Sequence, residues 1–172
     1  MIAQWRLLQG RSAGVSRMIT VLREAGVPDT PVPIGANPHT CAALLDAILS
    51  TTTGMANAAT TVARVDSLLL GGPAASDASA YAHIVMARLW ERLGHADHAL
   101  AAIRRRSYLA GWPRYLATAR REEGRLAGRN GDRDGAAMAY REYLALRNAP
   151  EVQVQSEVTA VRAAEATLRG EQ

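Results

Sequence analysis

One spacing of small residues, glycine and proline recurs three times along the chain and limits what it can fold into. In each copy a glycine follows a small residue by seven positions, an alanine follows the glycine by five, and a proline follows the glycine by nineteen. The copies are Ala47, Gly54, Ala59 and Pro73; Ala87, Gly94, Ala99 and Pro113; and Gly124, Gly131, Ala136 and Pro150. Successive glycines are 40 and 37 residues apart, a period typical of stacked helical hairpins. The pattern therefore predicts an all-α fold.

The residue types in this pattern suit the positions that a helical hairpin requires. A glycine permits the positive φ that a chain often adopts between two helices. Small residues on either side let the helices approach closely, and proline cannot continue a helix interior. Apolar residues between these markers have helical spacing. In the first copy they are Cys41, Leu44, Leu45 and Ile48, followed by Met55, Ala59, Val62, Val65 and Leu69.

The repeats resemble those of the tetratricopeptide repeat (TPR) family. The third copy, GRLAGRNGDRDGAAMAYREYLAL, carries the family pattern most fully, with Tyr140 four residues after Ala136. Ile103 takes the aromatic position in the second copy and Ala63 in the first, and the prolines come about two residues late. The resemblance covers residues 38–150 and implies a right-handed stack of antiparallel helical hairpins, a TPR-like α-solenoid with three repeats. A plain helical bundle is the alternative.

The segments outside the repeats differ in composition. Residues 151–172 predict a C-terminal capping helix, because an apolar stripe is combined with charged residues on the other faces. The stripe is Val154, Val158, Val161 and Leu168, and the charged residues are Glu157, Arg162, Glu165 and Arg169. Residues 28–37 predict a proline-rich connector, and Asn37 with Pro38 predicts the N-cap and first position of the next helix. Residues 1–27 predict a partial N-terminal hairpin.

The N-terminal hairpin lacks the polar outer surface that normally ends a helical-repeat stack. Its apolar residues are Ile2, Trp5, Leu8, Val15, Met18, Ile19 and Leu22. We therefore expect the chain to be the C-terminal part of a longer repeat protein, or to begin at a start codon placed too late. In isolation it is expected to self-associate through residues 1–25, fray there or aggregate, because a large apolar patch is usually covered.

Hydrophobic periodicity and helix-ending residues predict where the helices lie. The expected bounds are 1–9, 12–25, 38–52, 55–70, 77–93, 96–106, 113–129, 132–147 and 151–169. The composition agrees, since hydrophobic residues make up 48% of the chain, aromatic residues only 5%, and alanine-rich sequences favour helix. No β-branched run with a period of two is present, so no sheet is expected.

No group of residues in the sequence predicts catalysis or metal binding. Cys41 is the only cysteine and lies on an apolar stripe, so it is expected to be a buried small hydrophobe. His95 and His98 flank a turn, where exposed histidines are commoner than zinc ligands. Glu122 and Glu123 have arginine neighbours at helical spacing, which predicts surface ion pairs rather than acid–base chemistry. Because the chain contains no Lys and no Gly-x-Ser-x-Gly elbow, we expect a protein that is not an enzyme and needs no cofactor.

Positive charge is concentrated between Arg104 and Arg133. This segment has nine Arg against three acidic residues, a net charge of +6 compared with +4 for the whole chain, and it contains Tyr108, Trp112 and Tyr115. In one interpretation the arginines form a solvated face and the aromatic residues pack between the second and third hairpins. In the other, both line a groove for an acidic peptide or nucleic acid. The candidate partner-binding residues are then Arg106, Trp112, Arg114, Tyr115, Arg120, Arg121 and Arg125.

Residues 81–168 are also similar to the C-terminal repeat modules of large bacterial signalling proteins, which follow a serine/threonine kinase or DNA-binding regulator domain. The stretches that carry the similarity are YAHIVMARLWERLGHADHALAAIRRR, GWPRYLATARREEGRLAGRNGDRDGAAMAYREYLALR and PEVQVQSEVTAVRA. Since no kinase motif is present, the similarity implies a non-catalytic scaffold that binds a protein or acidic peptide partner. The alternative is a basic module that contacts nucleic acid through Arg104–Arg133. Without an 18-residue apolar run or a signal peptide, no membrane association and a cytoplasmic location are expected.

Overall fold

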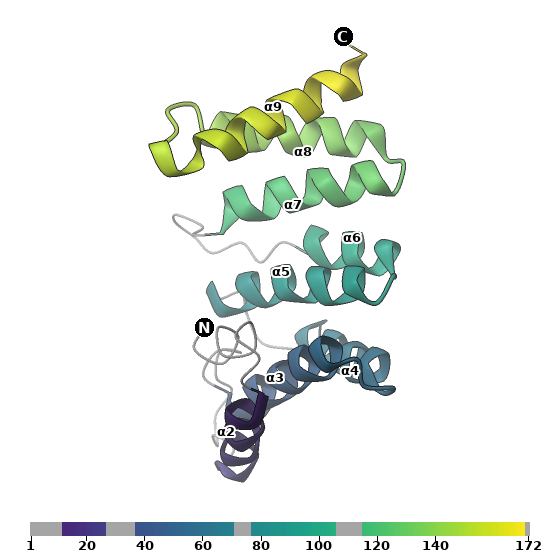
Figure 1. Cartoon of the computed structure of the whole chain (residues 1–172), viewed down its shortest axis with the longest axis vertical. Helices are drawn as coiled ribbons and strands as arrows, with labels where there is room; N and C mark the ends of the chain where they lie inside the picture. The colour runs from purple at the N-terminus through teal and green to yellow at the C-terminus, as the bar shows by residue number, and fades with distance from the viewer. Residues whose placement is uncertain (1–11, 27–36, 71–76, 106–114, 171–172) are drawn as a thin grey trace.

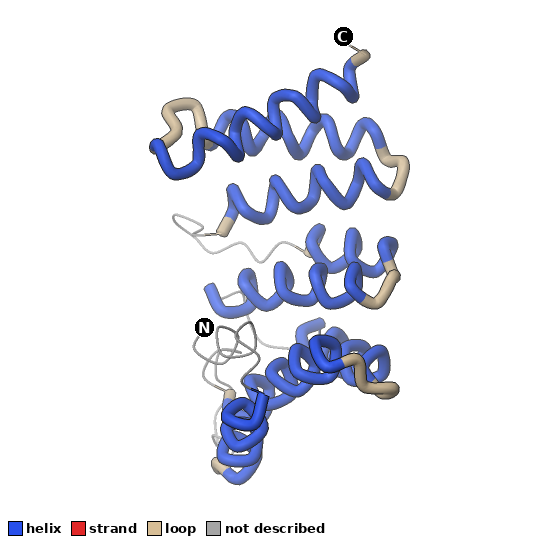
Figure 2. The backbone as a smooth tube through the Cα atoms, in the orientation of Figure 1, coloured by secondary structure: helices blue, strands red, loops and turns tan. Residues whose placement is uncertain are grey.

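A computed structural model describes residues 12–26, 37–70, 77–105 and 115–170 of the chain. The α-helices of these ranges are α2 (Ser12–Glu24), α3 (Pro38–Thr53), α4 (Ala58–Leu70), α5 (Asp77–Arg92), α6 (Ala96–Arg104), α7 (Leu116–Arg129), α8 (Arg133–Leu146) and α9 (Gln155–Arg169). A 3-10 helix, η2 (Val152–Val154), precedes α9. The described residues contain no strand, and the prediction of an all-α fold is confirmed for them (Figures 1 and 2).

Each helix packs against the next one along the chain, from α2 to α9. The helices follow one another along the long axis of the molecule, with α2 and α9 at opposite ends (Figure 1). The predicted bounds agree with the observed ones to within a few residues for most of these helices. The predicted helix 1–9 and most of the predicted connector lie outside the described residues.

The turns after α3, α5 and α7 share one geometry, which the repeated glycine predicts. Gly54, Gly94 and Gly131 have φ values of 69°, 83° and 77°. The residue after each glycine donates its backbone N–H to the carbonyl five positions earlier. These bonds join Met55 to Ser50 at 2.9 Å, His95 to Trp90 at 2.9 Å and Asp132 to Ala127 at 3.0 Å. This is the Schellman arrangement, which ends a helix on a left-handed residue.

The small residues of the repeat lie in the core, with one exception. The buried ones are Ala47, Ala87, Ala99, Gly124 and Ala136. The prediction for Ala59 is wrong, because Ala59 is exposed and Ala58 is buried instead. The connection between α3 and α4 spans residues 54–57, one residue longer than the connection 93–95 between α5 and α6. Helix α4 begins at residue 58 rather than at the predicted residue 55, and Met55 is exposed.

The core extends through the series of helices in two adjoining clusters. The larger cluster runs from Val15 on α2 to Ala136 on α8. The smaller joins Tyr140 and Tyr143 of α8 to Val158 and Val161 of α9, and Leu168 packs against both clusters. Neighbouring helices are therefore held together mainly by apolar burial.

The start of α3 and the surface of α9 confirm some predictions and correct one. The Asn37 side chain caps α3 by accepting from the backbone N–H groups of His39 and Thr40 at 3.0 and 3.1 Å, and Pro38 begins the helix. On α9 the apolar stripe is buried as predicted at Val158 and Val161. The prediction that Glu165 lies on an outer face is wrong. Glu165 is buried and accepts a hydrogen bond at Oε1 from Arg169 Nε at 2.6 Å.

Candidate interaction surface on α5 and α7

The structure places four of the seven predicted partner-binding residues. The other three, Arg106, Trp112 and Arg114, lie outside the described residues. Tyr115 directly precedes α7 and is half-buried, with its ring centroid 5.4 Å from that of Tyr81 on α5. The remaining three, Arg120, Arg121 and Arg125, belong to α7. Helix α7 is therefore the element on which a site can be built.

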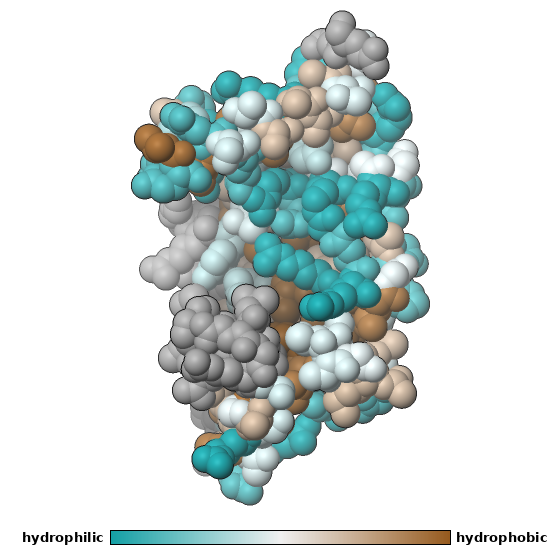
Figure 3. Space-filling view, in the orientation of Figure 1, coloured by the Kyte–Doolittle hydropathy of each residue, from teal (hydrophilic) through white to brown (hydrophobic). Residues whose placement is uncertain are grey.

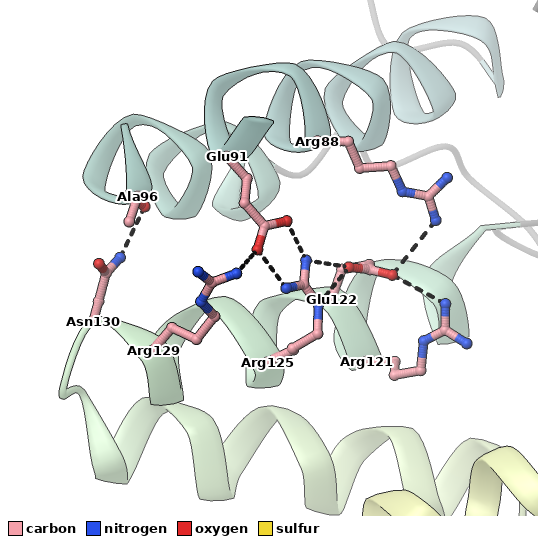
Figure 4. Close-up of polar contacts among 8 residues, drawn as sticks. All are labelled: Arg88, Glu91, Ala96, Arg121, Glu122, Arg125, Arg129 and Asn130. Atoms are coloured by element: carbon pink, nitrogen blue, oxygen red, sulfur yellow. Dashed lines mark hydrogen bonds and ion pairs between the residues drawn. The ribbon is translucent and has the colours of Figure 1, made fainter. Parts of the chain in front are cut away.

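A row of ion pairs joins α5 to α7 along one face (Figure 4). Both carboxylate oxygens of Glu91 on α5 accept hydrogen bonds from Arg125 on α7, at 2.5 and 2.6 Å. Glu91 also pairs with Arg129, one turn further along α7. Glu122 accepts from Arg125 at 2.8 and 3.0 Å and lies 3.4 Å from the guanidinium group of Arg88 on α5. The pairs thus cross from one helix to the other in both directions.

Arg121 extends this row to helix α9, which packs on the far side of α8. It donates to Glu122 at 3.0 Å and pairs with Glu157 of α9, which also accepts a hydrogen bond from the Tyr143 hydroxyl at 2.5 Å. We call Arg88, Arg121, Arg125 and Arg129 the arginine face.

The carboxylates of this row lie beneath the guanidinium groups. The side chains of Glu91 and Glu122 are 19% and 10% exposed, whereas those of Arg88 and Arg129 are 45% and 62% exposed. In the space-filling view, hydrophilic residues gather over α5 and α7 (Figure 3). Around Glu91 and Glu122 the surface therefore presents arginine N–H groups to solvent while the two carboxylates are largely covered.

The arginines keep both carboxylates ionised. The hydrogen bond from Arg125 lowers the pKa of Glu91, and burial only partly opposes it. For Glu122, burial is the largest influence and by itself raises the pKa. Hydrogen bonds from Arg125 and Arg121 outweigh burial, so that the pKa of Glu122 is also lowered. Carboxylates held in this way are poor proton donors near neutral pH.

Glu122 and Glu123 form the predicted ion pairs with arginines of their own helix, but the prediction that these pairs lie at the surface is wrong, because both glutamates are buried. Successive residues of a helix point about 100° apart, so the two carboxylates meet different partners. Glu123 lies 3.3 Å from Arg104 Nε and accepts from Arg120 at 3.0 Å. At least two arginines surround each carboxylate, which is the condition under which a buried charge is tolerated.

Glu123, Arg104 and Arg120 form a second network of ion pairs, and the two arginines connect it to α8. Arg120 Nε lies 2.5 Å from Glu142 Oε2. Arg104 pairs with Asp132, which caps α8 by accepting from the backbone N–H of Gly135 at 2.9 Å. A Cβ at position 135 would lie 2.6 Å from Arg104 Nη2, so glycine leaves room for this pair.

A third cluster joins α4, α5 and α6 around the buried Asp66. Arg105 donates to both oxygens of Asp66, at 2.5 and 2.9 Å, and the Trp90 indole N–H donates at 3.3 Å. His83 is buried close to this pair. Burial and then Arg105 lower the pKa of His83, with Asp66 opposing them. No sequence pattern predicts this cluster, because Asp66 and Arg105 are 39 residues apart and no spacing relates them.

Residues distant in sequence compensate much of the charge between Arg104 and Arg133. Every arginine that the structure describes in this segment contacts a carboxylate or, for Arg133, the Leu168 carbonyl at 2.8 Å. Four of the carboxylates come from outside the segment: Asp66, Glu91, Glu142 and Glu157. The local excess of positive charge seen in the sequence is thus much reduced in the fold.

His95 and His98 lie against the ring of Trp90, and Cys41 is partly buried. The ring centroid of Trp90 lies 4.7 Å from that of His98 and 5.4 Å from that of His95. Within the described ranges, no three His, Cys, Asp or Glu side chains are grouped to hold a metal ion. Cys41 is half-buried rather than fully buried as predicted, and burial raises the pKa of its thiol.

Comparisons of the chain with family models, curated proteins and solved structures find no match. Of the helices described, none has the length and apolar character needed to cross a membrane.

Proposed function

We propose that this chain is a helical-repeat scaffold that binds a protein or peptide partner. Its helices would form a right-handed stack of antiparallel hairpins of the TPR type. The observation that carries the proposal is the recurrence of one Schellman turn at Gly54, Gly94 and Gly131. The helix before each turn contributes a buried small residue to the core. Turns that share one hydrogen-bond pattern and recur at intervals of 40 and 37 residues are typical of a repeat architecture.

Two positions in the third copy support antiparallel pairing of α7 and α8. Gly124 contacts Tyr140, and a Cβ at Gly128 would lie 3.8 Å from Ala136 Cβ. Moving forward along α7 therefore corresponds to moving backward along α8. This is the register of a hairpin closed at Gly131.

The chemistry of the described residues favours binding over catalysis. General acids and bases work best with a pKa near the operating pH. The pKa values of Glu91, Glu122 and Asp132 are lowered by arginines, which makes these carboxylates stable partners in ion pairs. The similarity to repeat modules of bacterial signalling proteins makes recruitment of a signalling partner the role that we propose.

Selection from a random peptide display library on the full-length chain tests this function. We expect enriched peptides with micromolar Kd whose binding slows amide hydrogen exchange in α5 and α7. An unrelated helical protein of similar charge is the control. Failure to enrich any peptide over that control, at several salt concentrations, would contradict the scaffold proposal.

Nucleic acid is the second candidate, because the chain carries a net charge of +4. Binding of a DNA or RNA oligomer that weakens steeply with salt and ignores base sequence would favour it.

A further inference from the structure

We propose that the arginine face binds an acidic peptide segment through the outward N–H groups of Arg88 and Arg129. This inference rests on the proposed scaffold function and adds the surface and the chemistry of the partner to it.

The arginines of the face differ in how fully their donors are used. A guanidinium group has five N–H donors. Arg125 makes four hydrogen bonds to Glu91 and Glu122 and has little left to offer a ligand. Within the described parts of the chain, Arg88 donates only to Glu122 and Arg129 only to Glu91. Most donors of these two exposed side chains are therefore directed at solvent.

The buried carboxylates hold these two arginines in place. Glu122 restrains Arg88 and Glu91 restrains Arg129, and the two lie on either side of Arg125 in the row (Figure 4). A side chain already held by one ion pair loses less conformational freedom when it binds a second anion. The face thus offers two positioned guanidinium groups, each able to take a carboxylate.

Charge complementarity selects an acidic segment as the occupant. The four arginines of the face pair with three carboxylates, those of Glu91, Glu122 and Glu157, which leaves one positive charge in excess on the face. A nucleic-acid backbone is favoured less, because it gains most from an uninterrupted row of positive charge and here carboxylates alternate with arginines. Tyr81 and Tyr115, which could otherwise stack on bases, pack against each other with ring centroids 5.4 Å apart.

The test uses a fluorescein-labelled peptide in which Glu alternates with Gly and Ser, and a matched peptide with Gln in place of Glu. Fluorescence anisotropy of the full chain gives Kd at low and at physiological salt. The variants are Arg88→Gln, Arg129→Gln and the two combined. These variants leave Arg125 bound to the carboxylates of Glu91 and Glu122, so the fold is expected to persist. Thermal unfolding of each variant checks this. Arg162→Gln is the matched control, since Arg162 is exposed on α9 and has no ion pair within the described residues.

We expect each single variant to raise the Kd of the acidic peptide about fivefold, and the double variant more than about tenfold. Arg162→Gln should leave Kd unchanged, and the Gln peptide should not bind. Replacing both arginines by lysine keeps the charge but removes the fork geometry, so an intermediate Kd is expected.

The inference is overturned if the wild-type chain does not bind the acidic peptide, or if the double variant binds it as tightly as the wild type does. It is also overturned if single-stranded DNA binds this face more tightly than the peptide. If selected peptides bind independently of Arg88 and Arg129, the scaffold function is supported but the arginine face is not the binding site. Absence of any selected peptide would instead contradict the scaffold function itself.

Discussion

Gly124 on α7 lies against the ring of Tyr140 on α8, so closely that a Cβ at position 124 would be 3.0 Å from Tyr140 Cγ and would overlap two further ring carbons. These residues are the small and aromatic members of the third sequence repeat. The absence of a side chain at Gly124 therefore sets how closely the two helices approach.

Gly124→Ala should consequently destabilise the protein. Overpacking of a tight helix contact costs about 1–3 kcal/mol, more than the approximately 1 kcal/mol that alanine gains over glycine in helix propensity. Urea unfolding at pH 7 measures the difference. Gly128→Ala on the same helix is the control, because its Cβ would meet Ala136 Cβ at an ordinary 3.8 Å. Equal stability of the two variants would contradict this account, whereas recovery in the double variant Gly124→Ala/Tyr140→Leu would support it.

Gly131→Val should destabilise by at least about 1 kcal/mol, because β-branched residues are strained at its φ of 77°. Since no atom lies within 4 Å of the Cβ position, the cost is conformational rather than steric. Gly131→Asn separates conformational strain from steric overlap, because asparagine tolerates the left-handed region although its side chain is larger than that of alanine. Thermal unfolding should give Gly131→Asn a higher Tm than Gly131→Val. An unchanged melting curve for the valine variant would count against backbone strain at this position.

Stability should fall in acid because of Glu91 and Glu122. The ordinary pKa of each is 4.5, and the fold lowers both. The unfolded chain therefore binds protons first, so the stabilisation is complete above pH 4.5 and is lost as pH falls through the lower folded pKa values. Urea midpoints measured from pH 7 to pH 3 should show this loss. The loss should be smaller in Glu91→Gln and unchanged in the exposed control Glu24→Gln.

His83 should add a separate loss at milder pH. Its ordinary pKa is 6.5 and the fold lowers it, so the unfolded state binds more protons once pH falls below 6.5. The free energy of unfolding should thus decrease as pH falls from above 6.5 toward the folded pKa, and His83→Gln should remove this part of the dependence. His98→Gln, at an exposed position, is the control. A profile in which both variants behave as the wild type would remove His83 from this role.

Asp66→Asn should cost about 3–5 kcal/mol, because it leaves the partly buried Arg105 without its carboxylate. Asp46→Asn is the matched control. Asp46 pairs with Arg23 at 2.7 Å, but that arginine is 54% exposed, and surface pairs contribute only about 0–1 kcal/mol. Thermal or urea unfolding should therefore separate the two variants clearly. Similar effects at both positions would mean that burial does not decide the strength of these pairs.

Local features were predictable from the sequence because their causes lie within a few residues. The positive φ of Gly54, Gly94 and Gly131 was predictable because each glycine follows a run of helical periodicity, where it permits a left-handed residue, and the capping of α3 follows from Asn37 and Pro38. Register across a hairpin was less predictable. Helix α4 begins four residues after Gly54, whereas α6 and α8 begin two residues after Gly94 and Gly131, and the buried alanine of α4 is Ala58 rather than Ala59; no local signal marks this difference.

The sequence by itself determined the helices, their glycine turns and much of the apolar core, since these depend on backbone preference and on periodicity within each helix. Only the tertiary structure decided what the charges do. Glu91 meets Arg125 and Asp66 meets Arg105 across 34 and 39 residues of chain, because packing brings their helices together. A charged residue on the outside of one helix is covered when the next helix packs against it, as Glu122 and Glu123 are. Packing therefore converts an apparent basic stretch into a network of ion pairs that leaves Arg88 and Arg129 at its exposed edge.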